Sequence, residues 1–188
     1  MQIMSTTTTP ITAEQLYALG DIGRCELIDG EIIHVAPAGA EHGHIAGEIF
    51  RRIANHVAAN KLGKVYAAET GFTIRRKPDV TRAPDAAFVR NERLPRQPRR
   101  GFFEGAPDLA VEVVSPNDAL SAVKAKVDDW LASGATSVWV VDPPNQTIEI
   151  YRQGNVVLRY RHEDELRDEP TLPGFTLKLA DVFAAAGE

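Results

Sequence analysis

The sequence predicts one mixed α/β domain, and three observations support this prediction. The chain has 188 residues, 44% of them hydrophobic and 25% charged, as expected for a soluble globular domain with a buried core. A strand–helix–strand pattern over residues 109–141 favours a parallel strand pair with a right-handed crossover. Hairpin signals elsewhere add antiparallel strands, so we expect a mixed sheet flanked by helices, without internal repeats or linkers.

This domain is expected to span residues 11–188, after a disordered tail over residues 1–10. The tail lacks the positively charged start and apolar stretch of a secretory signal. No apolar run approaches the roughly 20 residues that a membrane span needs. The single cysteine, Cys25, cannot form an internal disulfide. We therefore expect a cytoplasmic protein with no membrane partner.

The first half of the chain is predicted to be rich in strands. A Thr-Ala-Glu-Gln capping box favours a short helix over residues 12–19. The Asp29-Gly30 dipeptide lies between apolar-containing runs at residues 24–28 and 31–36, which indicates a hairpin.

A long helix is expected next, from about residue 41 to residue 60. Four apolar side chains recur there every four residues and form one buried stripe: Ile45, Ile49, Ile53 and Val57. Strands are predicted over residues 64–68, 71–74 and 86–89. Residues 91–105 are rich in arginine, proline and turn formers and are predicted to be a loop.

The second half begins with LAVEVV, residues 109–114, a run typical of a strand buried on both faces. The following helix is predicted to continue to about residue 133, where Gly134 ends it. Further strands are predicted over three ranges: 137–141, 147–152 and 156–160. A short segment at 172–179 and a small helix at 180–183 complete the chain.

The net charge of −5 argues against a simple nucleic-acid coat protein, because phosphate binding requires cations. Residues 75–100, however, hold nine basic and three acidic residues and are locally basic. This segment suggests contacts with a polyanion such as a nucleic-acid backbone, and a solvated charged loop is the alternative. The candidate contacts are Arg75, Arg76, Lys77, Arg82 and Arg90.

Glu112 is the most informative residue, because a carboxylate within a buried strand is costly unless it is paired, protonated or bound to metal. Asp85 follows Pro84 at the start of another short strand. Two carboxylates on adjacent strands can lie about 5 Å apart and share a hard cation. Asp108 would lie roughly 13 Å from Glu112 along the same strand, so Asp85 is the better partner.

A cation is expected to complete the site. The helix after the Glu112 strand packs back along it, and its rise brings Lys124 and Lys126 level with Glu112. Both lysines flank the apolar stripe of this helix, so periodicity does not choose between them.

Together these residues are similar to the PD-(D/E)XK nuclease pattern with a migrated lysine, and the chain as a whole resembles the Uma-two family of restriction-endonuclease-like proteins. Seven segments match in order. They are ELIDGEII (26–33), Pro37 to His42, APDAAFV (83–89), GAPDLAVEVVSP (105–116), KVDDWLASGA (126–135), VWVVDP (138–143) and LPGFTLKLADVF (172–183).

The resemblance implies a restriction-endonuclease-like core and a Mg²⁺-dependent endonuclease acting on nucleic acid, most naturally DNA, with Mn²⁺ able to substitute. It assigns Asp85 and Glu112 as metal-binding and catalytic carboxylates, with the backbone carbonyl of Val113 as a further ligand. It selects Lys126 over Lys124 as the catalytic lysine, from its distance to Gly134. The sequence departs from the superfamily pattern at one position, Val114, where a lysine is usual.

Two further residues are auxiliary candidates from the resemblance. They are His42 on the long helix and Glu31 in the Asp-Gly-Glu turn. A homodimer is compatible with cutting both strands of a duplex. The alternative function is an inactive nucleic-acid- or protein-binding module that retains the nuclease fold.

Overall fold

The computed structural model describes residues 9–97, 100–116 and 118–184. Its largest element is a mixed six-stranded sheet. The strands lie in the order β11 (Val156–Arg161), β10 (Thr147–Arg152), β9 (Ser137–Asp142), β8 (Leu109–Val113), β6 (Ala86–Arg90) and β3 (Gly63–Ala67). Strands β8 and β9 are parallel, and all other neighbours in this sheet are antiparallel. The predicted strand–helix–strand crossover and mixed sheet are therefore confirmed.

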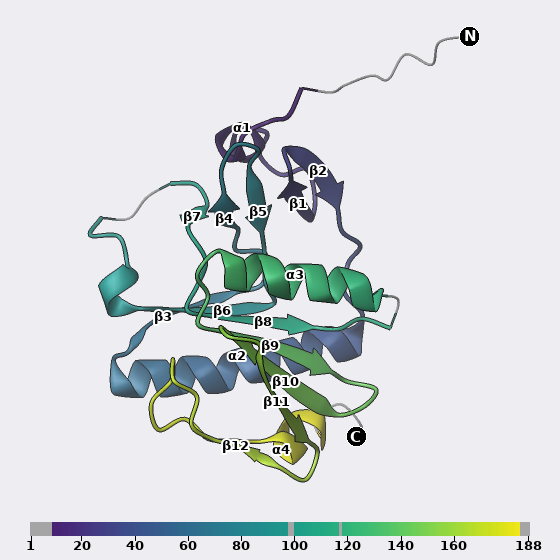
Figure 1. The fold of residues 1–188 in the computed structure, drawn as a ribbon, viewed down its shortest axis with the longest axis vertical. Helices are drawn as coiled ribbons and strands as arrows, with labels where there is room; N and C mark the ends of the chain where they lie inside the picture. Colours follow the sequence, from purple (N-terminus) through teal and green to yellow (C-terminus); the bar gives the residue numbers. More distant parts are fainter. Residues whose placement is uncertain (1–8, 98–99, 117, 185–188) are drawn as a thin grey trace.

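Two helices cover opposite faces of this sheet (Figure 1). Helix α2 (Ala40–Asn60) buries the predicted stripe of residues at four-residue spacing. Helix α3 (Leu120–Ala132) connects β8 to β9 and buries Val127 and Trp130. The sheet is thus apolar on both faces, as the continuous hydrophobic runs of β8 and β9 indicate.

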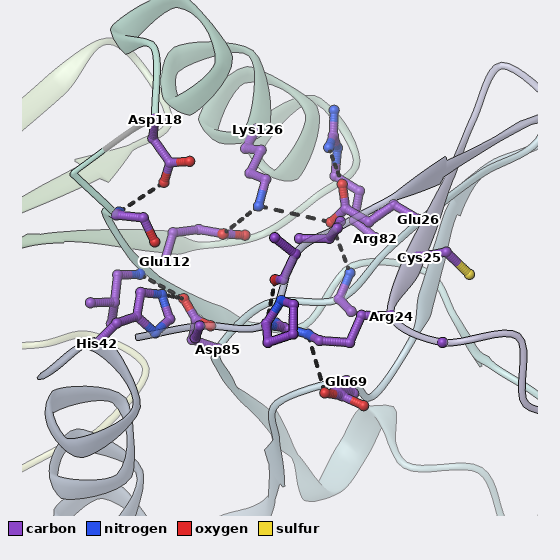
Figure 2. Close-up of a pocket in the computed structure, with 18 of the residues that line it drawn as sticks. Arg24, Cys25, Glu26, His42, Glu69, Arg82, Asp85, Glu112, Asp118 and Lys126 are labelled. Atoms are coloured by element: carbon purple, nitrogen blue, oxygen red, sulfur yellow. Dashed lines mark hydrogen bonds and ion pairs between the residues drawn. The ribbon is translucent and has the colours of Figure 1, made fainter. Parts of the chain in front are cut away.

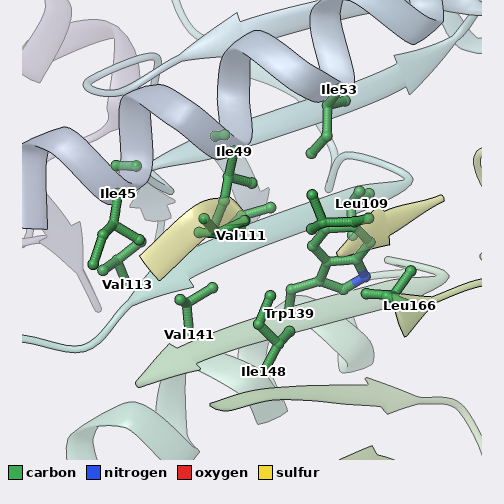
Figure 3. Packing of buried hydrophobic residues seen from close by; sticks show 14 of the residues in the cluster. Ile45, Ile49, Ile53, Leu109, Val111, Val113, Trp139, Val141, Ile148 and Leu166 are labelled. Carbon is green, nitrogen blue, oxygen red and sulfur yellow. The ribbon is translucent and has the colours of Figure 1, made fainter. Parts of the chain in front are cut away.

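The alternation of side chains along β8 fixes the direction in which Glu112 points. Leu109, Val111 and Val113 pack in the cluster that contains the α2 stripe (Figure 3). Ala110 packs in the cluster that contains Trp130 of α3. Because successive side chains of a strand face opposite sides, Glu112 lies on the α3 side of the sheet.

A second, five-stranded sheet lies beside helix α1 (Ala13–Ala18) at the other end of the molecule (Figure 1). Its order is β2 (Glu31–His34), β1 (Cys25–Ile28), β5 (Val80–Arg82), β4 (Phe72–Arg75) and β7 (Phe103–Glu104). The predicted capping box and hairpin are confirmed: the Thr12 side chain caps α1, and β1 pairs with β2 around the Asp29-Gly30 turn.

Two strands of this sheet, β5 and β7, were absent from the sequence prediction. Strand β5 has three residues, all buried, and pairs with β1 and β4. Strand β7 has two residues, lies within the predicted loop and pairs with β4. Both are too short for a hydrophobic pattern, so partner strands rather than local propensity define them. The start of this loop forms a 3₁₀ turn, η1 (Asn91–Arg93).

The C-terminal segments cover the α2 side of the large sheet. Strands β12 (Glu165–Leu166) and β13 (Leu177–Lys178) pair, and helix α4 (Leu179–Phe183) follows. The predicted segment over residues 172–179 thus contributes only a two-residue strand, because Leu172 and Phe175 are buried in the core without joining a sheet.

Residues 1–8, which make up most of the predicted tail, lie outside the described residues. Ile11 is attached to the fold, since its N–H donates to the carbonyl of Gly30 at 2.9 Å. None of the described helices is both long enough and apolar enough to cross a bilayer.

Candidate active site

Glu112 belongs to β8 and is 5% exposed, and its side chain lies between this strand and α3. One carboxylate oxygen accepts a hydrogen bond from Trp130 Nε1 at 2.8 Å, and the other lies 3.1 Å from Lys126 Nζ. Burial raises the pKa of Glu112 by disfavouring its charged form, and the negative charge of Asp85 adds to this, while Lys126 acts in the opposite direction. The site therefore holds a buried carboxylate with two dedicated donors.

Asp85 lies next to Glu112 because β6 pairs with β8 in antiparallel register, with Ala86 opposite Val111. The Asp85 N–H donates to the Val111 carbonyl at 2.9 Å. Its Oδ2 accepts from the Val113 N–H at 2.8 Å. These two bonds on either side of Glu112 hold the two carboxylates in one corner of the cavity, as Figure 2 shows.

Of the two candidate lysines, the structure brings only Lys126 to the carboxylates. Burial disfavours its ammonium form, but Glu112 and Glu26 outweigh this and raise the pKa of Lys126. Lys124 points away: its side chain is 75% exposed, and its Nζ lies 3.4 Å from Asp128. Lys126 remains protonated and ion-paired within the site, whereas Lys124 belongs to the outer face of α3.

His42, in the first turns of α2, faces Asp85, with 3.4 Å between its Nε2 and Asp85 Oδ2. The hydrogen bond to Asp85 raises the pKa of His42, and burial only partly opposes this. The His42 Nδ1 is buried and has no hydrogen-bond partner among the described residues. Glu31 lies elsewhere: it is exposed on β2 and is not among the residues that line the cavity.

Glu26 belongs to the same corner, although sequence reasoning missed it. It is 8% exposed on β1, and its Oε1 lies 3.9 Å from Lys126 Nζ. Its other oxygen is 2.8 Å from Arg82 Nη1. A carboxylate in the short strand CELI was a detectable signal. However, a hairpin strand can turn alternate residues to solvent, so burial of Glu26 could not be deduced from the pattern.

The structure requires a correction for Arg82, which was expected to contact a nucleic-acid backbone. Its side chain is buried, and its guanidinium contacts Glu26 and, at 2.6 Å, Asp129 of α3. These two carboxylates occupy its donors. Arg82 therefore joins β5, β1 and α3 from within and is not available on the surface for phosphate.

The other residues of the predicted phosphate-binding set lie outside the cavity, and three of them are ion-paired. The pairs are Arg75 with Asp29; Arg76 with Glu14, Asp79 and Glu104; and Arg90 with Asp108. Lys77 is exposed in the turn between β4 and β5. Most of these acidic partners lie outside residues 75–100, so a local charge count does not include them, and they neutralise several of the basic residues.

The carboxylates and Lys126 open into one cavity of about 960 Å³. Its polar lining includes Arg24, which pairs with Glu69 at 3.1 Å (Figure 2). Its apolar lining includes Tyr17 and Phe102. A cavity of this size and mixed lining is typical of small-molecule and cofactor sites.

The donor set fits a hard divalent cation. The described residues contain no cluster of three or more His, Cys, Asp or Glu side chains placed to hold a metal. Mg²⁺, however, is commonly held by one or two carboxylates, with water filling its remaining positions. Asp85 and Glu112 supply such carboxylates, and the Nε2 of His42 lies beside Asp85.

Comparisons with known proteins agree with this architecture. Residues 12–180 match the profile of the Uma2 (Uma-two) family, described as "Putative restriction endonuclease". The crystal structure of "a putative nuclease belonging to DUF820" from Anabaena variabilis ATCC 29413 superposes with a TM-score of 0.80. It is 23% identical in sequence, and the match covers 94% of this chain and 99% of that one. No curated protein gives a significant match.

Proposed function

Since this chain belongs to the Uma2 family of restriction-endonuclease-like proteins, we propose that it is a divalent-metal-dependent nuclease. The proposed reaction is hydrolysis of phosphodiester bonds, with DNA as the substrate. The observation that carries this proposal is that Asp85 lies beside Glu112 and Lys126, where the start of β6 meets the end of β8.

Asp85 and Glu112 would hold Mg²⁺, or Mn²⁺ in its place, with the carbonyl of Val113 as a further oxygen ligand. When bound, such an ion polarises a phosphoryl oxygen and lowers the pKa of a bound water. The chain itself contributes rigidity. Asp85 is fixed by the Val113 N–H, and Glu112 by Trp130, so neither carboxylate needs to reorganise when an ion enters.

Lys126 would hold the attacking water or offset negative charge that develops on the phosphate. Glu26 and Glu112 lie on either side of its ammonium group and limit where it can move. Arg82 anchors Glu26 and also holds Asp129, on the same helix as Lys126. This chain of ion pairs positions the lysine relative to β8, although Val114 replaces the lysine usual on that strand.

Nicking assays with paired lysine variants test the proposal. The substrates are a supercoiled plasmid and a single-stranded DNA circle, each incubated with Mg²⁺ or Mn²⁺. Lys126→Ala should reduce cleavage by about 100-fold or more, the scale for removing one transition-state electrostatic contact. Lys124→Ala, an exposed neighbour on the same helix, is the matched control and should cleave like the wild type.

Glu112→Ala should abolish cleavage in the same assay. Folding of each variant is checked by its unfolding transition. Cleavage by folded Glu112→Ala at the wild-type rate would exclude this site as the catalytic centre. Binding of DNA without cleavage by the wild type would instead favour a binding module that has lost turnover.

A further inference from the structure

The cavity that holds the carboxylates also has an aromatic wall. Tyr17, at the end of α1, is 51% exposed and lines the cavity together with Phe102. The two rings meet edge to face, with centroids 5.6 Å apart and an interplanar angle of 83°. Packing of the core does not require an aromatic side chain to be exposed inside a cavity. Such an exposed apolar surface is typical of a binding site.

This wall is fixed in place from both sides. Helix α1 is tied to the β4–β5 turn, because the Ala13 N–H donates to Asp79 at 2.9 Å. Phe102 lies directly over Gly71, where any Cβ atom would overlap the ring. The adjacent Phe103 N–H donates to the Gly71 carbonyl at 2.9 Å. These contacts hold the backbone of α1 and the Phe102 ring, and Tyr17 packs on that ring, so little of the wall needs ordering when a ligand arrives.

The charges around the cavity argue against a long phosphate backbone in it. Seven carboxylate side chains line the cavity, against three Lys or Arg side chains and His42, and all three of these Lys and Arg side chains are ion-paired. On the outer surface, Arg75, Arg76 and Arg90 also have carboxylate partners. Among the residues that line the cavity, few cations are therefore free to contact the many phosphates of a duplex.

From these observations we infer that the substrate is nucleic acid with unpaired nucleotides, such as a single strand, and that Tyr17 and Phe102 form a base-stacking subsite. This inference rests on the proposed function of the carboxylate site and names its substrate class. The faces of bases in a duplex are covered by their neighbours, so only an unpaired base can lie on the aromatic wall. A strand held there would continue through the same cavity that Asp85, Glu112 and Lys126 line.

A binding experiment tests the subsite without relying on cleavage. The probe is a fluorescent single-stranded DNA oligonucleotide, with the same sequence as a duplex for comparison, and Ca²⁺ as the divalent ion. Tyr17→Ala should weaken single-strand binding by about 5- to 150-fold, since stacking contributes about 1–3 kcal/mol per base. Tyr17→Phe should bind like the wild type, because stacking does not need the hydroxyl group.

The matched control is Ile33→Ala, which removes an apolar side chain that is 46% exposed on β2 and does not line the cavity. It should leave binding unchanged. The inference is overturned if the wild type prefers the duplex, binds neither probe, or loses nothing in Tyr17→Ala.

The two proposals can fail separately. Tyr17-dependent binding of the single strand without cleavage would support the stacking subsite and refute the nuclease proposal. Cleavage of the duplex at least as fast as the single strand, with no effect of Tyr17→Ala, would support the nuclease and refute the subsite.

Discussion

At the scale of single residues, the site depends on how Glu112 tolerates burial. Its strand position forces the side chain toward α3, where Trp130 and Lys126 each donate to one oxygen. If the buried carboxylate had no such donors, the free energy of unfolding would be lower by several kcal/mol, the usual scale for an unpaired buried charge. Trp130 therefore supports the site as well as the core.

Replacing the indole by a ring without an N–H tests this role of Trp130. Trp130→Phe should lower the free energy of unfolding by about 1.5–3 kcal/mol, the range for hydrogen bonds to charged groups. The loss is measured by urea unfolding of the wild type and the variant. The smaller ring also changes packing, so the same substitution is made in a Glu112→Leu background, where residue 112 cannot accept the hydrogen bond. An equal loss in both backgrounds would show that the hydrogen bond to Glu112 contributes nothing.

At the scale of elements, Asp79 connects α1 to the five-stranded sheet. Burial opposes ionisation of Asp79, but the N–H groups of Ala13 and Lys77 and the guanidinium of Arg76 outweigh it and lower the pKa of Asp79. A carboxylate whose pKa is lowered by folding adds stability above its unfolded pKa, near 4. That stability is lost as the pH falls through the lower, folded pKa.

Asp79→Asn should therefore destabilise the protein by about 1.5–3 kcal/mol at pH 7. The difference from the wild type should shrink as the pH falls below the unfolded pKa near 4 and through the lower, folded pKa, because the wild-type carboxylate then becomes protonated. Chemical unfolding of both proteins across this pH range provides the measurement. A difference that stays constant with pH would contradict the assignment of Asp79 as a charged anchor.

Some helices and strands could be predicted from the sequence, and others could not. Helix α2 was predicted to within one residue at its start, because its apolar stripe repeats over four turns. Strand β8 was recognisable from its continuous apolar run, and Glu112 from its position inside that run. Strands β5 and β7 were not predictable, since pairing with distant strands creates them.

Within the site, local sequence determined less. The position of α3 along β8 was compatible with either Lys124 or Lys126 as the catalytic lysine. The rotation of the packed helix about its axis decides which of them faces Glu112. The burial of Arg82 depends on Glu26 and Asp129, which are 56 and 47 residues away along the chain. Such long-range ion pairs carry no local signature, so the basic segment appeared more available to phosphate than it is.

At the scale of the whole molecule, the large sheet supplies the carboxylates and α3 supplies the lysine. The smaller sheet, with α1, completes the cavity and brings the aromatic wall to it. In the function proposed here, the large sheet and α3 would supply the chemistry, and the smaller sheet with α1 would select the substrate. If the substrate is single-stranded, one copy of the chain suffices for cleavage, and the predicted homodimer is not required for activity.

Calorimetric titration of Mn²⁺ and Mg²⁺ into the metal-free protein tests the central claim most directly. The wild type and Lys124→Ala should bind both ions, Mn²⁺ more tightly, as expected for oxygen-ligand sites. Asp85→Ala and Glu112→Ala, each shown to be folded, should lose this binding. Unchanged metal affinity in both carboxylate variants would contradict the account, because Asp85 and Glu112 would then serve the fold alone.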